Sequence, residues 1–448
     1  MFTRRNFLLA GTGLGATALL KPAFSAATPD NLGRLIAGAG RASIMLDGLY
    51  PIDNFVGEHD PLCIRVLLLE GENLRQAIVV MDITSLTQEV ISRMKTILTN
   101  EAGVDAKNAV ITASHTFSTP HIFTGDREAS YTSALLNAFE NALRLAIRLA
   151  ISTLQPVSLG NGNGFCRIGV NRNINTPFGW WLGANDAGYT DPHVGVISLN
   201  GRDGLPLAIL MNYSVQPAVM DASQITTGGR LISADLAGAV SRHVETHFDN
   251  KTIAFYLVGC AGDQVPYVQA SRHIVHSDGS AGRIDINEKG FALLDLFGQR
   301  LADEVIRITN GIKPQATHVF SMKREQITLN TQQFSPRNAP VGPVKTFSFK
   351  PDGQATMPVV LMQWGNIALV GVQPELNAIL GHHIRLNSPF AQTFVMTMVD
   401  GAAKYLPDFS DYKRFTYEAR SSPFAPGAGE VAVEAIVNQL KCMWASTT

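Results

Sequence analysis

The sequence predicts an α/β fold of the mixed α+β kind, built as one large domain with long loops over the strand ends. Apolar strand-like runs alternate with helical stretches at the start of the chain, an order typical of α/β layers. The chain has 448 residues, of which 46% are hydrophobic, so it can bury a sizeable core. No linker, internal repeat or low-complexity run marks a domain boundary.

The clearest elements are expected in the first 150 residues. Cys63–Leu69 and Gln76–Met81 are apolar runs bounded by Gly and Asp, which is typical of buried strands. Helical spacing of apolar residues follows in Thr87–Leu98 and in Tyr131–Ala150. Before these elements, Arg34–Ser43 is expected to form a strand and a turn.

The rest of the chain continues this alternation after a region that we expect to be mostly loop. Gly160–Gly188 is rich in Gly and Asn and contains Trp180 and Trp181, and long loops inside a compact domain are usually functional. Strands are expected at His193–Leu199, Leu207–Tyr213, Thr252–Val258, His318–Leu329, Val359–Gln363 and Ile367–Val372. Helices are expected at Ala234–His247, Asn287–Ile308 and Pro374–Ile384.

Residues 1–27 resemble a twin-arginine signal peptide. Arg4 and Arg5 precede a Gly-rich apolar stretch and then small residues, with cleavage expected near Ser25 to Ala27. The apolar stretch is short for a membrane anchor, which is the alternative, and no later segment reaches the length of a span. We therefore expect residues 28–448 to be exported by the twin-arginine machinery and to be periplasmic or secreted.

Charge and cysteine content exclude several classes of protein. The chain has 36 basic and 37 acidic residues without a run of like charge, so neither nucleic acid nor an anionic membrane is an expected partner. A small-molecule, lipid or glycan substrate would be recognised locally. The four cysteines are scattered without C-x-x-C spacing, which predicts neither a zinc cluster nor a disulfide framework, although one bridge remains open.

Polar residues follow apolar runs at five places in the chain. In an α/β fold the ends of several strands meet at one crevice, so these residues are candidates for a site. The alternative is that Asp82 and Glu375 simply cap the helices that follow them. The five residues are Asp82, His115, Gln216, Asp263 and Glu375.

Taken in order, several short motifs resemble the neutral/alkaline (non-lysosomal) ceramidase family, which are zinc-dependent amidases that cleave the N-acyl bond of ceramide. The similarity spans most of residues 28–448, so it implies the fold of the family's N-terminal catalytic domain. We expect no C-terminal immunoglobulin-like domain, because the chain ends soon after the last motif. The motifs are AGAGRASI at residues 37–44, VMD at 80–82, ASHTFSTP at 113–120, GVNR at 169–172, LISAD at 231–235, AGD at 261–263, and DG with YLP, Tyr412 and YE between 400 and 418.

The resemblance also implies roles for individual residues. His115, Glu375 and Tyr405 match zinc ligands of the family, and Gln216 stands where the family has a second zinc histidine. Arg172 matches an arginine near the substrate. The candidate metal ligands are His115, Gln216, Glu375 and Tyr405, and the candidate catalytic residues are Asp263, Arg172, Glu375 and Tyr405.

Three departures from the family pattern affect the chemistry. Phe117 replaces a histidine beside the substrate, Gln216 replaces the zinc histidine, and Val265 replaces the serine. A neutral amide is a poor zinc ligand, so zinc affinity should be weakened, and a valine cannot act as a nucleophile. Hydrolysis would then need water activated by a metal or by a carboxylate such as Asp263 or Glu375. Other histidines could replace the lost ligand, and the candidates are His121, His193, His382 and His383.

Four hypotheses of function follow. The first is an exported hydrolase that cleaves an amide or ester bond at a degenerate metal site, and the second is ceramide N-deacylation with zinc. The third is a glycoside hydrolase with two carboxylates in an aromatic crevice suggested by Trp180, Trp181 and Tyr189. The fourth is a non-catalytic binding protein on a ceramidase scaffold.

Overall fold

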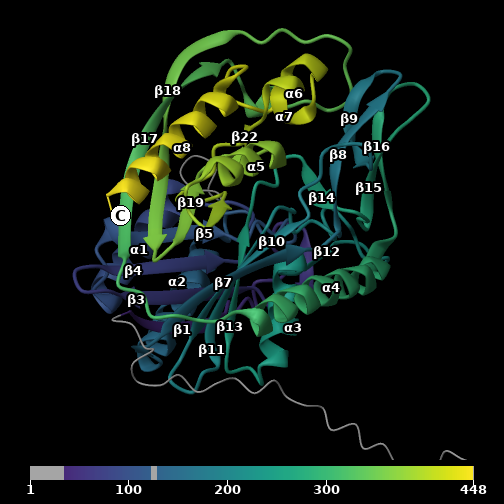
Figure 1. Cartoon of the computed structure of the whole chain (residues 1–448). Coiled ribbons are helices and arrows are strands. Elements are labelled where there is room, and N and C mark those ends of the chain that lie inside the picture. Colours follow the sequence, from purple (N-terminus) through teal and green to yellow (C-terminus); the bar gives the residue numbers. More distant parts are fainter. Residues whose placement is uncertain (1–34, 123–128, 447–448) are drawn as a thin grey trace, which may run out of the picture.

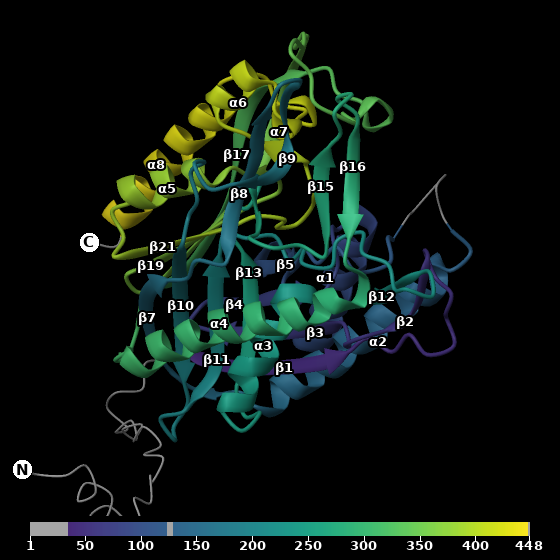
Figure 2. The ribbon, with the colours of Figure 1, turned by 90° about the vertical axis from the view of Figure 1, so that its right-hand side faces the viewer.

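The structure is a computed structural model that describes residues 35–122 and 129–446. The expected signal peptide at residues 1–27 lies outside these residues. Three mixed sheets form the body of the molecule, and helices cover them on two sides (Figures 1 and 2). The expected mixed α/β fold is confirmed.

The first sheet has the strand order β5-β4-β3-β1-β6. The β1, β3 and β4 strands pair antiparallel, whereas β4 and β5 are parallel across the helix α1 (Gln88–Ala102). Thr87 caps α1, since its side chain accepts a hydrogen bond from the backbone N–H of Val90. The strands are β1 (Ile36–Ser43), β3 (Cys63–Glu70), β4 (Arg75–Met81), β5 (Ala109–Ala113) and β6 (Gln155–Pro156).

The second sheet has the order β13-β11-β10-β7 and is parallel only between β11 and β13, which the helix α3 (Asp235–His247) connects. The third sheet has the order β17-β18-β19-β21 and is parallel only between β19 and β21, which α5 (Ala378–Asn387) connects. The strands are β7 (Ser158–Phe165), β10 (His193–Asn200), β11 (Pro206–Tyr213), β13 (Ile253–Val258), β17 (Phe320–Gln332), β18 (Pro351–Trp364), β19 (Ile367–Val372) and β21 (Gln392–Met396).

Four small sheets flank this body, and in Figure 1 β22 lies above it while β8, β9, β14, β15 and β16 lie at its upper right. They join β14 to β8 and β9, β15 to β16, β20 to β22, and β2 to β12. Their strands are β2 (Phe55–Glu58), β8 (Gly169–Thr176), β9 (Gly179–Asn185), β12 (Arg230–Ile232), β14 (Gln264–Pro266), β15 (Ser271–Val275), β16 (Ala281–Asp285), β20 (Glu375–Leu376) and β22 (Tyr405–Leu406).

The core is divided into layers between sheets and helices. Inner faces of all three large sheets meet in one apolar cluster that includes Leu67, Leu210 and Leu369. A second cluster holds α1, α2, α3 and α4 against the first two sheets, and a third holds α5 and α8 against the third sheet. The remaining helices are α2 (Thr132–Ser152), α4 (Gly290–Gly311), α6 (Phe409–Arg414), α7 (Tyr417–Arg420) and α8 (Ala428–Ala445).

Two expectations based on glycine were wrong. Residues 158–185 form strands β7, β8 and β9 rather than long loops, and β1 runs straight through the expected turn to Ser43. The glycines of β7 alternate along the strand because α4 lies against it. A Cβ atom at Gly160 would stand 2.3 Å from Ile312, and one at Gly162 would stand 2.7 Å from Ile308. These glycines therefore allow a helix to approach a strand.

The two proposed helix caps were also wrong. Asp82 binds Arg65 and the backbone N–H of Cys63, while Thr87 caps α1. Glu375 lies in β20, and α5 begins three residues later than Glu375, after Asn377. Both carboxylates therefore have partners outside the helix that follows them.

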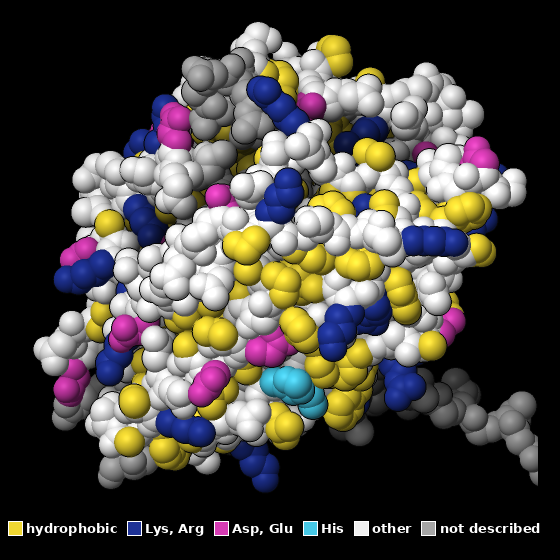
Figure 3. Space-filling view, turned by 90° about the horizontal axis from the view of Figure 1, so that it is seen from above, with side chains coloured by type: hydrophobic (Ala, Val, Ile, Leu, Met, Phe, Trp, Pro, Cys, Tyr) yellow, Lys and Arg dark blue, Asp and Glu magenta, His cyan; other side chains and the backbone are white. Residues whose placement is uncertain are grey.

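The chain has a formal net charge of -1 at pH 7, so neither sign of charge dominates overall. The face seen from above in Figure 3 carries hydrophobic side chains in a central band, with cationic and acidic side chains interspersed. Within residues 35–122 and 129–446, no helix combines the length and the apolarity that a membrane span requires. The four cysteines, all in the described part of the chain, are unpaired.

Candidate functional site

Strand ends and short strands bring five of the expected residues together. Parallel pairing of β20 with β22 places Glu375 beside Tyr405. His115 follows β5, Gln216 follows β11, and Arg172 lies in β8. All five side chains are buried, with at most 7% of the surface of each residue exposed. This convergence is the arrangement that the strand-end rule predicts.

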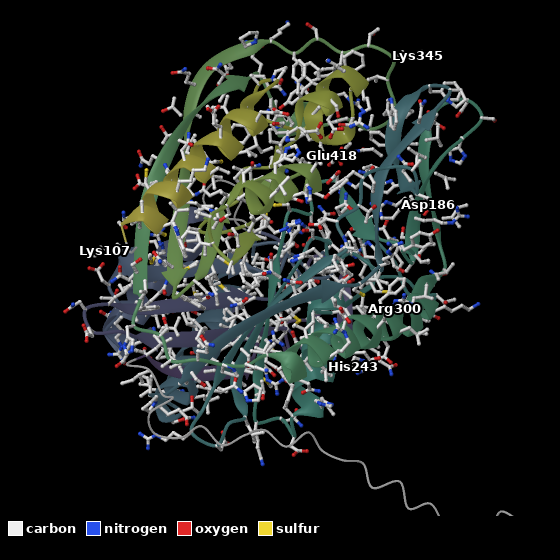
Figure 4. All side chains as sticks on the ribbon, viewed as in Figure 1. Lys107, Asp186, His243, Arg300, Lys345 and Glu418 are labelled. Carbon is white, nitrogen blue, oxygen red and sulfur yellow. The ribbon has the colours of Figure 1, made fainter. Side chains whose placement is uncertain are left out.

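A continuous series of polar contacts links these residues, and we call it the polar chain. Nε of Arg172 donates to Oε1 of Glu418 at 2.6 Å, and Nη1 of Arg172 donates to Oε1 of Gln216 at 3.0 Å. Nε2 of Gln216 donates to Oε2 of Glu375 at 2.5 Å, and the same oxygen lies 3.1 Å from Nε2 of His115. Glu418 lies in α7 and is fully buried, and Figure 4 labels it in the upper part of the molecule.

A backbone turn and one hydrogen bond fix the orientation of the His115 ring. The residue has a φ of 68°, which turns the chain sharply after β5, and Nδ1 donates to the carbonyl oxygen of Thr84 at 2.6 Å. Nε2 therefore points at Glu375, although the two groups are not aligned for a hydrogen bond. Burial acts to lower the pKa of His115, but the Glu375 carboxylate outweighs burial and raises it.

The amide of Gln216 can have only one orientation. Its oxygen accepts from the Arg172 guanidinium, and its nitrogen donates to the Glu375 carboxylate. Rotating the amide by half a turn would place donor against donor and acceptor against acceptor. The oxygen of Gln216 is consequently held away from Glu375.

In front of the polar chain lies a cavity of about 300 Å³, which we call the Arg172 cavity. Phe117 lines the cavity and also packs edge-on against the His115 ring at 4.7 Å between centroids. Phe117 thereby separates His115 from the cavity. The wall consists of Phe117, Arg172, Trp181, Leu182, Gly183, Gln216, Ala218, Asp221, Val265, Gln269, His273, Arg283, Pro340, Tyr405 and Tyr417.

The outer part of the wall is polar. Nη2 of Arg283 on β16 pairs with Oδ2 of Asp221 at 2.9 Å, and His273 lies on the neighbouring strand β15. Burial and the charge of Arg283 lower the pKa of His273 to about 4. His273 is therefore neutral at neutral pH.

Asp263 lies outside the cavity wall and has a structural environment. Its Oδ1 accepts from the backbone N–H of Ala378 at 2.8 Å, and Oδ2 accepts from Nδ2 of Asn171 at 2.8 Å. Its backbone oxygen accepts from the N–H of Arg172 at 2.9 Å. Burial raises the pKa of Asp263 to about 7. The residue joins the start of α5 to β8.

The expected residues thus fall into three groups. Arg172, Gln216 and Tyr405 line the cavity wall, and His115 and Glu375 lie behind it. Asp263 instead links the start of α5 to β8.

The other expected contributors are placed elsewhere. Of the three aromatic residues expected in a crevice, only Trp181 lines the cavity. Trp180 lies on Arg414, and Tyr189 lies on His382. His121 pairs with Asp53. The histidines suggested as replacement ligands, His121, His193, His382 and His383, are all absent from the cavity wall.

Sequence reasoning missed three groups on the wall. His273 and Arg283 lie in the hairpin of β15 and β16, which is polar and follows no apolar run. The strand-end rule, which selects polar residues after apolar runs, therefore did not select them. Tyr417 was noticed only as part of a motif, yet its ring lies 5.6 Å from the guanidinium of Arg172. The ring centre of Tyr405 lies 5.2 Å from the same guanidinium, and the two tyrosine rings pack edge to face at 5.7 Å. Contact with these two rings favours a fixed orientation of the Arg172 cation.

The residues present do not fit a zinc ion. One feature suits a metal, since Nε2 of His115 is buried without an aligned hydrogen bond and Nδ1 is held by a carbonyl, as in many metal-binding histidines. However, Gln216 turns its N–H toward Glu375, and burial raises the pKa of Tyr405 well above its usual range. In the described part of the chain, no three His, Cys, Asp or Glu side chains are grouped to hold a metal.

Comparisons with known proteins give the class of fold. The structure is similar to the crystal structure of neutral ceramidase from Pseudomonas aeruginosa, with a TM-score of 0.71 and 18% identity over 92% of this chain and 74% of that chain. It is also similar to a ceramidase complexed with C2, with a TM-score of 0.70 and 17% identity over 93% of this chain and 76% of that one. No protein-family model and no curated protein matches the sequence. The chain has the neutral ceramidase fold.

Proposed function

We propose that this chain binds a small molecule in the Arg172 cavity, without a zinc ion and without turnover. The observation that carries the proposal is the polar chain, in which residues at the family's metal-ligand positions bond to one another. Gln216 joins Arg172 to Glu375, so both ends of its amide are occupied. Behind the wall this arrangement acts as a rigid support, while the cavity in front of it has the volume of a small-molecule pocket.

Turnover is disfavoured because the candidate nucleophiles and bases at the wall are replaced, covered or poorly matched, and the Asp221 carboxylate is paired with Arg283. Val265 lies on the wall where the resemblance implies a serine, and it has no reactive atom. His115 is covered by Phe117 and directed at Glu375. His273 is on the wall, but a base with a pKa of about 4 is poorly matched to catalysis near neutral pH.

The test combines metal analysis, an activity panel and a binding screen on residues 28–448. Protein folded with zinc present and then dialysed should retain no stoichiometric zinc. It should not hydrolyse ceramide, N-acyl amides, nitrophenyl esters or nitrophenyl glycosides. A small-molecule library should yield a saturable ligand whose affinity falls in Tyr417→Ala. Turnover that disappears in Glu375→Gln, or the absence of any saturable ligand, would overturn the proposal.

A second candidate is hydrolysis of an amide or ester bond. It is favoured by the place of Arg172 and Tyr405 on the wall, together with the fold that the two named ceramidases share. The glycoside hydrolase has less support, because Asp263 and Glu375 both lie off the wall, and among the described residues Asp221 is the one carboxylate that lines it. The activity panel separates these candidates from binding alone.

We also propose export by the twin-arginine machinery, on the basis of Arg4, Arg5 and the stretch that follows. Replacing both arginines by lysine should retain the protein in the cytoplasm, as cell fractionation would show. Unchanged export of that variant would contradict the proposal.

A further inference from the structure

We infer that the ligand of the Arg172 cavity is a neutral, polyhydroxylated ring of about monosaccharide size, and this inference rests on the proposed binding function. Three observations carry it: aromatic residues in the wall, buried hydrogen-bond donors of the wall that lack aligned partners, and a balanced set of charges. Each observation restricts the class of ligand that the cavity can bind.

The wall combines aromatic surface with planar polar groups. Phe117, Trp181, Tyr405 and Tyr417 supply aromatic rings, and Gln269, Asp221 and Arg283 supply planar hydrogen-bonding groups at the outer part. A pyranose ring has an apolar C–H face and a polar rim of hydroxyls. Such a molecule can therefore pack on an aromatic ring while its rim bonds to amide, carboxylate and guanidinium groups.

Two residues of the wall carry unpaired polar atoms. In the part of the chain that the structure describes, Nη2 of Arg172 and Nε1 of Trp181 are buried donors without an aligned acceptor, and both side chains line the cavity. A buried unpaired polar atom costs about 1–3 kcal/mol, so a ligand that pairs these atoms gains affinity. A hydroxyl can accept from such donors and can also donate to a carboxylate such as Asp221 on the same wall, whereas a carboxylate ligand only accepts.

The charges around the cavity argue for a neutral ligand. Arg172 is paired with Glu418, Arg283 is paired with Asp221, and His115 faces Glu375. A carboxylate ligand near Arg172 would add a third negative group beside Glu418 and Glu375. A neutral hydroxyl adds none, and it keeps the existing pairs intact.

The cavity volume limits the size of the ring. About 300 Å³ lies at the lower end of the range for small-molecule pockets, so one sugar ring fits better than a chain of rings. Trp181 on β9 is the side chain that offers both an aromatic ring and an unpaired donor. Its neighbour Trp180 does not line the cavity and lies against Arg414 instead.

The experiment is calorimetric titration of residues 28–448 with methyl glycosides of glucose, galactose, mannose and N-acetylglucosamine, and with benzoate and benzamide as comparison probes. At least one glycoside should bind saturably and more tightly than benzoate. Trp181→Phe keeps an aromatic ring and removes the N–H donor, so it should weaken binding about tenfold. The matched control Trp180→Phe should leave the affinity unchanged.

Asp221→Asn, at the outer part of the wall, gives a second variant if Trp181→Phe does not fold, and it should also weaken glycoside binding. Absence of saturable glycoside binding would overturn the inference, as would preference for benzoate or equal effects of the two tryptophan variants. If benzamide or benzoate binds instead and Tyr417→Ala weakens it, the sugar inference fails while small-molecule binding stands. Hydrolysis of the panel substrates would instead overturn the proposed function.

Discussion

Asp82 and Glu375 are two buried carboxylates that follow apolar runs and face a cationic group, yet their surroundings differ. Oδ2 of Asp82 accepts from the backbone N–H of Cys63 at 2.8 Å and from Nη1 of Arg65 at 3.1 Å, inside the first sheet. Glu375 contacts Gln216 and His115, and the far side of Gln216 opens on the Arg172 cavity. A polar residue at a strand end therefore marks a functional site only where a cavity adjoins it.

We call Asp82 with Arg65 the Asp82 cluster, and Glu375 with Gln216 and His115 the Glu375 cluster. The stability of the fold should depend more on the Asp82 cluster than on the Glu375 cluster. Asp82→Ala leaves Arg65, which is only 3% exposed, without its close partner, since Nε of Arg65 lies 3.8 Å from Glu245. Breaking a buried pair by removing one partner costs about 3–5 kcal/mol. Urea unfolding followed by circular dichroism should show a loss of that size, and no change in cavity binding in the folded fraction. A loss below about 1 kcal/mol would remove the distinction between the clusters.

A third buried carboxylate, Asp263, has hydrogen-bond donors but no cationic partner within residues 35–122 and 129–446. Burial raises its pKa from 3.8 to about 7, so the folded state binds this proton more tightly than the unfolded chain does, and protonation stabilises the fold. The unfolded chain loses this proton above about pH 4. The stabilisation is therefore complete below pH 4 and is lost as pH rises through 7, by about 4 kcal/mol in total.

Asp263→Asn should remove this pH dependence. The difference in unfolding free energy between wild type and variant, measured from pH 4 to pH 7, should fall by about 3 kcal/mol. The matched control is Asp303→Asn at an exposed position on α4, which should give a nearly constant difference. A constant difference for Asp263→Asn as well would show that Asp263 is ionised in the fold throughout this range.

The Glu375 cluster should be convertible into a metal site by one change. Gln216→His would place an imidazole beside Glu375 and His115 and would remove the amide that occupies the carboxylate. Imidazole is a much better zinc ligand than an amide, so zinc affinity should rise about a hundredfold, or about 2.7 kcal/mol.

Competition with a chelator of known affinity would measure this gain. Gln269→His is the control, because Gln269 lines the same cavity and its side chain is held by the carbonyl oxygen of Ala218. It should not raise zinc affinity. Tight stoichiometric zinc binding by the wild type would contradict the proposal that the polar chain binds no zinc ion.

The sequence could predict which strand ends meet, but not how the side chains there pair. Periodicity located β3, β4, β11 and β13, and the strand-end rule selected His115 and Glu375. Whether Gln216 serves as a ligand or as a bridge depends on Arg172, which comes from a different sheet. The glycine-rich region was wrongly expected to be loop for the same reason, because its role depends on a distant part of the chain. Gly160 and Gly162 permit close contact with a helix almost 150 residues away.

The smallest effect is expected at the cavity wall itself, where Val265→Ser would introduce a hydroxyl. Val265 is 5% exposed, so exchanging its methyl groups for a hydroxyl should cost about 1 kcal/mol of stability. No amide or ester hydrolysis should appear, because a serine needs a base and His115 remains behind Phe117, directed at Glu375. Unfolding curves and the nitrophenyl ester assay measure both parts. If the single change produced turnover, His115 would have to reach the cavity, and the separation of the polar chain from the cavity by Phe117 would be wrong.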